Sequence, residues 1–84
     1  MTREQQSYIE AVEASLEAFY GKSKIEAKRL VNEWWKRLSE SKAVESGLFL
    51  HAEPINTAAG IAGVCVVQVT SENREAYHRI LNGI

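Results

Sequence analysis

The chain has 84 residues, 45% hydrophobic and 25% charged, with a formal net charge of −1. This length predicts a single domain over 1–84 with a thin core, and the balanced composition excludes wholesale disorder. The small net charge argues against a general nucleic-acid binder, which would carry a clear basic excess.

The charged residues are unevenly distributed. Eight of the ten Lys and Arg residues lie at or before Lys42, and the stretch 43–71 contains none. This distribution predicts solvated amphipathic helices in the first half of the chain. It predicts that the second half is buried between these helices or against a partner.

The first predicted element is a helix over 3–20. Thr2 and Gln5 have the spacing of a capping box, and Gly21 is suited to end the helix in a left-handed conformation. Apolar side chains recur at intervals of three and four residues, which is the helical period. They are Tyr8, Ile9, Val12, Leu16, Phe19 and Tyr20.

The second predicted helix begins at Lys24 and ends at Leu38 or slightly later. Ser23 and Glu26 have the spacing of a second capping box. Trp34 falls on the apolar stripe, whereas Trp35, about 100° further round, falls on its shoulder. The short Gly21-Lys22 connection predicts an antiparallel helical hairpin.

The middle of the chain predicts a short helix and a two-stranded β element. Pro54 is suited to open a helix over 54–62. The segment 64–70 is rich in β-branched residues, which favours a strand, and its only plausible partner is 47–52.

The last predicted element is a helix capped by Thr70 or Ser71, with Glu72 in its first turn and Gly83 at its end. Its apolar face comprises Ala76, Tyr77, Ile80 and Leu81. The resulting fold class is α+β and mainly helical. The alternative is an all-α bundle of four or five helices.

The favoured function is a protein–protein interaction or regulatory module. Trp35 is displaced from the core stripe, and Leu48 and Phe49 are consecutive apolar residues near His51. Exposed aromatic and apolar side chains mark partner sites, and the open edge of a strand over 64–69 would add another. The expected partner is another protein or a second copy of the chain, as in a homodimer.

The alternative function is nucleic-acid binding through the second helix, which we regard as the less favoured partner class. Lys28, Arg29, Lys36 and Arg37 form a basic stripe beside Trp35, and aromatic and basic side chains together can hold nucleic acid. Interspersed glutamates, including Glu33 four residues before Arg37, equally predict a solvated helix face.

A thiol-dependent enzyme is the remote alternative, in which Cys65 would work with His51 and Glu53. The simpler reading makes Cys65 a small core residue, and we assign no catalytic residue. Two distant histidines, one cysteine and no Asp make no zinc pattern, so we expect no metal or cofactor.

We expect a cytoplasmic location without membrane insertion. A lone cysteine cannot form a disulfide within the chain, so no oxidising compartment is implied. The longest run of apolar residues and glycine, 58–67, is about half of the roughly 20 residues that a membrane-spanning helix needs.

Overall fold

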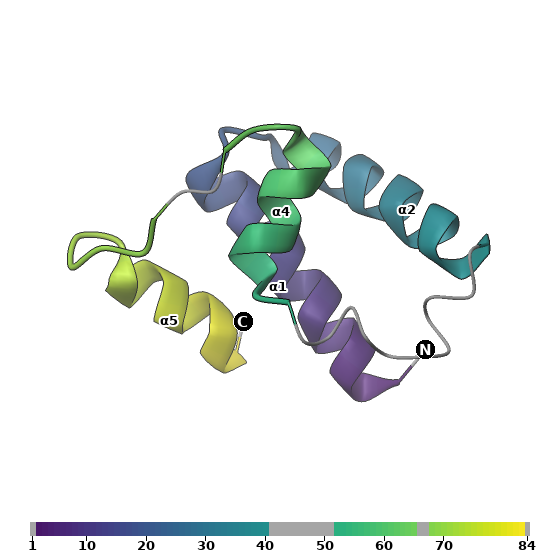
Figure 1. Ribbon diagram of the computed structural model, residues 1–84. Helices are drawn as coiled ribbons and strands as arrows, with labels where there is room; N and C mark the ends of the chain where they lie inside the picture. Colours follow the sequence, from purple (N-terminus) through teal and green to yellow (C-terminus); the bar gives the residue numbers. More distant parts are fainter. Residues whose placement is uncertain (1, 41–51, 66–67, 84) are drawn as a thin grey trace.

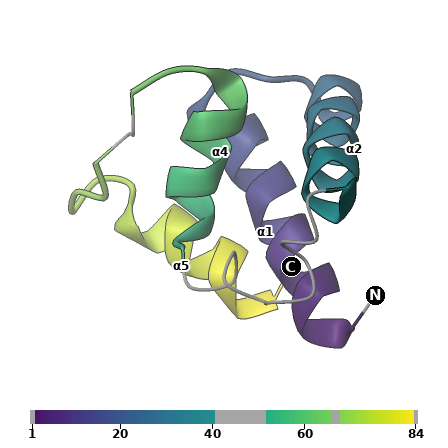
Figure 2. The ribbon, with the colours of Figure 1, turned by 45° about the vertical axis from the view of Figure 1, so that its right-hand side comes forward.

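The computed structural model describes residues 2–40, 52–65 and 68–83, and this part of the chain contains four helices and no strand. The helices are α1 (Arg3–Phe19), α2 (Lys24–Glu40), α4 (Pro54–Ala62) and α5 (Arg74–Gly83). Helix α1 lies between α2 on one side and α4 and α5 on the other (Figures 1 and 2). The all-α alternative fits this arrangement, and the α+β prediction is wrong.

The ends of α1 follow the predicted signals. Thr2 Oγ1 accepts a hydrogen bond from the Gln5 amide at 3.1 Å, and Gln5 Oε1 accepts one from the Thr2 amide at 2.9 Å. Gly21 has φ 65°, so it turns the chain through the left-handed region that side-chain-bearing residues avoid. This turn sets up the antiparallel hairpin with α2.

Helix α2 begins where Ser23 Oγ accepts a hydrogen bond from the Glu26 amide at 3.1 Å. It continues to Glu40, in agreement with a predicted end at Leu38 or slightly later. One face of α2 is buried against α1, through Ala27 and Val31. The predicted helical hairpin is therefore confirmed.

The predicted strand over 64–70 is not formed in the described part of the chain. Helix α4 ends as predicted at Ala62, and Gly63 follows with φ 72°. Val64, Cys65 and the segment 68–70 are exposed and not in a strand. The proposed partner strand falls almost wholly at 47–51, outside the described residues. The β-branched composition of 64–70 is a weak preference, and nothing described here supplies the ladder that would make it a strand.

A local hydrogen-bonded turn precedes α5 and delays its start. The Thr70 amide donates to Asn73 Oδ1 at 2.7 Å, and Asn73 Nδ2 donates to the Gln68 carbonyl at 2.9 Å. An Asn side chain that bonds nearby backbone in this way competes with regular structure. Helix α5 therefore begins at Arg74, and Glu72 lies before it rather than in its first turn.

The core gathers around α1, whose buried side chains meet α2 on one side and α4 on the other. Its members are Tyr8, Ile9, Val12, Leu16, Ala27, Val31 and Ala58. The small side chains of α4, including the fully buried Ala58, let that helix approach α1 closely. This packing fixes the first turn of α4, beside which the candidate site lies.

Candidate partner-binding groove

Tyrosines from the rest of the fold attach to the first turn of α4. Tyr8 Oη, from α1, lies 2.6 Å from Thr57 Oγ1. Tyr20, which caps the end of α1, donates its hydroxyl to the Ile55 carbonyl at 2.9 Å. Partly buried hydrogen bonds of this kind fix position as well as adding stability.

Tyr77 attaches α5 to the same turn. Its hydroxyl donates to Glu53 Oε2 at 2.7 Å and accepts from the Ile55 amide at 3.4 Å. The Tyr77 ring also meets Phe19 of α1 edge to face, with ring centroids 6.2 Å apart. All three tyrosines of the chain thus hold residues 53–57 in place.

The hydroxyls of Tyr8 and Tyr77 keep their protons at neutral pH. Burial raises the pKa of Tyr8 above its ordinary value of 10.0, although the hydrogen bond with Thr57 acts in the opposite direction. Burial, and then the hydrogen bond to Glu53, raises the pKa of Tyr77 well above 10.0. Tyr8 and Tyr77 therefore act as hydrogen-bonding groups and not as bases.

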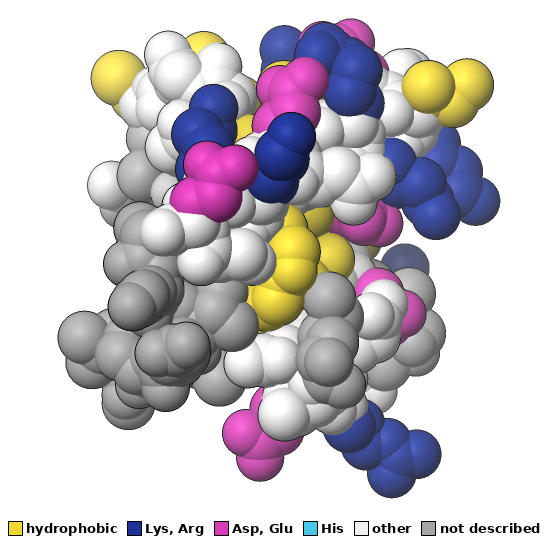
Figure 3. Space-filling view, turned by 90° about the vertical axis from the view of Figure 1, so that its right-hand side faces the viewer, with side chains coloured by type: hydrophobic (Ala, Val, Ile, Leu, Met, Phe, Trp, Pro, Cys, Tyr) yellow, Lys and Arg dark blue, Asp and Glu magenta, His cyan; other side chains and the backbone are white. Residues whose placement is uncertain are grey.

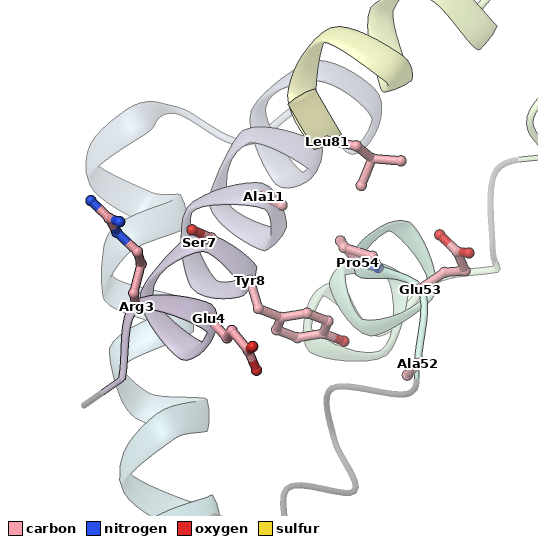
Figure 4. A pocket seen from close by; sticks show the side chains of 9 residues that line it. All are labelled: Arg3, Glu4, Ser7, Tyr8, Ala11, Ala52, Glu53, Pro54 and Leu81. Atoms are coloured by element: carbon pink, nitrogen blue, oxygen red, sulfur yellow. The ribbon is translucent and has the colours of Figure 1, made fainter. Parts of the chain in front are cut away.

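A surface groove of about 590 Å³ lies between the start of α1, the start of α4 and the end of α5. We call it the Leu81 groove. Leu81 points toward Pro54 across it, and Tyr8 extends along its floor (Figure 4). Glu4 lies beside Tyr8 and Glu53 lies beyond Pro54, whereas the Arg3 side chain points away from Leu81 (Figure 4).

A second hollow of about 430 Å³ lies on the other side of Leu81. Glu53 and Leu81 line both hollows, and Val69 and His78 line only the second. Leu81 is 45% exposed and Val69 is 43% exposed, which is high for large apolar side chains. Leu81 therefore stands as an apolar ridge between two hollows, with a carboxylate beside it.

Trp35, a predicted partner anchor, is half-buried. Both Trp34 and Trp35 pack against the core cluster, and their ring centroids lie 6.3 Å apart at a tilt of 55°. Trp34 also lines a shallow hollow with Arg37 and Ile61. The structure does not bring Trp35 to the Leu81 groove.

The other predicted partner residues are placed as follows. Leu48, Phe49 and His51 lie outside the described residues. The described residues of the predicted strand edge, 64–65 and 68–69, are not in a strand, and Val64 and Val69 are exposed. Of the described residues of that segment, Gln68 and Val69 line a hollow next to the groove.

Two of the basic residues of α2 lie close to glutamates. Arg29 pairs with Glu33 at 3.2 Å, and Lys28 acts electrostatically on Glu13 of α1. Arg37 lies beside Trp34 in the shallow hollow, away from Lys36 on the helix circumference. Lys and Arg side chains alternate with Glu over the visible face in Figure 3.

Glu53 and Cys65, the two described members of the possible thiol site, lie at opposite ends of α4. Cys65 is exposed, which corrects the expectation of a core cysteine. Glu53 precedes α4 and Cys65 follows it, so a helix of nine residues, about 13 Å at 1.5 Å per residue, lies between them. His51 lies outside the described residues.

No group of three or more His, Cys, Asp or Glu side chains that could hold a metal occurs among residues 2–40, 52–65 and 68–83. None of the four described helices combines the length and apolarity needed to cross a bilayer. No buried side-chain nitrogen or oxygen in the described ranges lacks a hydrogen bond.

The sequence pattern missed the groove because it placed Leu81 on the core side of the last helix. The structure buries Tyr77 on that face and leaves Leu81 at its edge. The signal available in the sequence was the number of tyrosines whose hydroxyls needed partners.

Searches of family models, curated proteins and solved structures found no match to the chain.

Proposed function

We propose that the protein is a small interaction or regulatory module and that the Leu81 groove is where it binds a protein partner. The observation that carries this proposal is the exposure of Leu81 between two hollows. Exposed apolar side chains in concave surfaces are typical of partner sites, and well-packed central anchors supply most of the binding energy.

The rigidity of the groove floor supports the same proposal. Tyr8, Tyr20 and Tyr77 hold the first turn of α4 through hydrogen bonds of 2.6–2.9 Å. A preorganised surface loses little conformational entropy when a partner binds, which favours affinity. The groove also lies away from the α1–α2 pairing, so occupation would leave that part of the core intact.

The partner class is another protein or a second copy of the chain, in a cytoplasmic setting. The one cysteine of the chain is exposed, and an exposed free thiol persists best in a reducing compartment. A homodimer through the groove would leave Leu81 buried in each copy.

Replacement of Leu81 by Asp tests the proposal, with Ile25→Asp as the matched control. Ile25 is 82% exposed and lies on α2, which does not line the groove. We expect affinity capture with the native protein to enrich a partner that Leu81→Asp loses and Ile25→Asp retains. Sedimentation equilibrium over a wide concentration range detects a second copy as that partner. The proposal would be contradicted if the native protein, Leu81→Asp and Ile25→Asp captured the same proteins equally and showed the same mass in solution.

Nucleic-acid binding through α2 is the competing function, and its support is weaker. Figure 3 shows Lys and Arg side chains interspersed with Glu side chains. Within α2, Arg29 pairs with Glu33 at 3.2 Å, which places a carboxylate beside the basic stripe. This function requires binding that weakens steeply with salt and with replacement of Lys28 or Lys36. A labelled duplex and single strand, tested at low salt, would reveal it.

A further inference from the structure

The Leu81 groove combines an apolar ridge with carboxylates. Glu4 and Glu53 line it, and the Arg3 side chain, its only cation among the described lining residues, points away from Leu81 (Figure 4). The second hollow adds no Lys or Arg from the described residues. The surface that meets a partner is therefore apolar and acidic.

Glu53 is held in a fixed orientation. Its Oε2 accepts the Tyr77 hydroxyl at 2.7 Å, while its residue remains exposed. Its other carboxylate oxygen, Oε1, has no hydrogen-bond donor within the described ranges. A carboxylate already fixed by one hydrogen bond can accept a second from a cation without losing further side-chain freedom.

The geometry of the two hollows suits two apolar side chains on one face of a helix. The hollows lie on either side of Leu81 and share Glu53 as a common wall. Side chains three or four residues apart on a helix have Cβ atoms about 5–6 Å apart, so they can straddle one leucine. Amphipathic helices commonly bind in grooves in this way.

We infer that the partner segment of this protein is a basic amphipathic helix whose apolar face straddles Leu81 and whose Lys or Arg side chains reach Glu4 and Glu53. This inference rests on the proposed function, because it names what the Leu81 groove binds. Charge complementarity favours this occupant over an acidic helix, which would place like charges beside Glu53.

A titration of the full, isotope-labelled chain with synthetic peptides tests the inference. The probe is a Leu/Lys amphipathic helix of roughly four turns. One comparison peptide replaces every Lys with Glu, and another replaces every Leu with Ser. We expect the Leu/Lys peptide alone to shift the amide resonances of Tyr8, Val69 and Leu81, with those of Ile25 unchanged.

Two pairs of variants locate the contacts. Glu4→Gln should weaken binding of the Leu/Lys peptide about three- to fivefold at low salt, as for an exposed ion pair, whereas the control Glu17→Gln should not. Leu81→Ser should abolish the shifts, and Ile25→Ser should leave them intact. Urea unfolding of each variant checks that it is folded.

Each other result overturns the inference in a distinguishable way. If the Leu/Glu peptide binds at Leu81 as well or better, the groove is a binding site but its partner is not basic. If the Ser/Lys peptide binds equally, the attraction is charge alone. If no peptide shifts Leu81 and the chain self-associates through it, the occupant is a second copy. If no peptide shifts Leu81 and the chain stays monomeric, both this inference and the proposed function lose their support.

Discussion

The Tyr77 hydroxyl lies 2.7 Å from Glu53 Oε2 and joins the last helix to the residue that precedes α4. The Tyr77 hydroxyl oxygen also accepts a hydrogen bond from the Ile55 amide at 3.4 Å. Glu53 itself offers no side-chain cap to the amides of α4, so Tyr77 takes over part of that role from another element. This contact and the packing of α5 on α1 together position α5, and Leu81 within it.

Tyr77→Phe should destabilise the fold by roughly 1–3 kcal/mol. It removes a hydrogen bond to a carboxylate and leaves the Ile55 amide without that acceptor, while the ring can still meet Phe19. Urea unfolding measures the change. A second substitution, Glu53→Gln, should cost less when added to Tyr77→Phe than on its own, because the two residues share one interaction. Independent effects would contradict the coupling.

Stability should fall at alkaline pH because of Tyr77. Its pKa is raised above the ordinary 10.0, so the folded state holds the phenolic proton more tightly than the unfolded state. The stabilisation is complete below pH 10 and is lost as the pH rises through the higher folded value. Unfolding midpoints above pH 10 should fall more steeply for the native chain than for Tyr77→Phe.

Glu13→Gln should stabilise the protein at neutral pH. Burial raises the pKa of Glu13 above 4.5, with neighbouring Glu10 and Glu17 adding to the shift and Lys28 opposing it. Below pH 4.5 Glu13 is protonated, and its raised pKa then contributes to the stability of the folded state. That contribution is lost as the pH rises through the raised pKa. The gain from Glu13→Gln should be present at pH 7 and shrink toward pH 4. A loss of stability at pH 7 would mean that attraction to Lys28 outweighs burial.

Gly60 within α4 and Gly63 directly after it should respond in opposite directions to alanine. Gly63 has φ 72°, so Gly63→Ala should destabilise by roughly 1 kcal/mol, although a Cβ there meets nothing within 4 Å. Gly60 is within the helix and also has open space, so Gly60→Ala should stabilise by about 0.5–1 kcal/mol. Thermal unfolding distinguishes them, and changes of the same sign would contradict the assigned backbone conformations.

Trp34→Ala and Trp35→Ala should both destabilise, each by roughly 1–3 kcal/mol, below the 3–5 kcal/mol of a fully buried tryptophan. Both rings are half-buried and pack against the core cluster. Urea unfolding of each variant and of the native chain measures the loss in free energy of unfolding. A negligible effect for Trp35 alone would favour its predicted role as a partner anchor.

The helix ends in the first half of the chain could be predicted because their signals are local. Thr2, Ser23 and Gly21 act through backbone groups within a few residues, and Pro54 fixes the start of α4 in the same way. The start of α5 was missed because Asn73 bonds backward to residue 68 and forms a turn. Whether residues 70–73 form a turn or the first turn of the helix depends on competing local hydrogen bonds, and the periodicity of apolar residues does not show which of them form.

The groove could not be predicted because it depends on how helices meet. The helical period puts Tyr77 and Leu81 on one face, but only the angle at which α5 lies on α1 decides that Tyr77 is buried and Leu81 is not. The predicted β pairing failed for a related reason. Strand formation depends on a partner, and strand composition in 64–70 does not provide one.

Helix α5 forms one wall of the groove, yet among the described helices its main neighbour is α1, and it is anchored through Tyr77. A helix that packs mainly on one described neighbour opens to solvent at a lower free energy than the core does. The groove therefore exists only while α5 is docked, and a ligand seated against Leu81 would hold α5 down. Occupancy should slow hydrogen exchange of the α5 amides well before it alters exchange at Val12 or Leu16, so the exchange rate of α5 would measure occupancy of the groove.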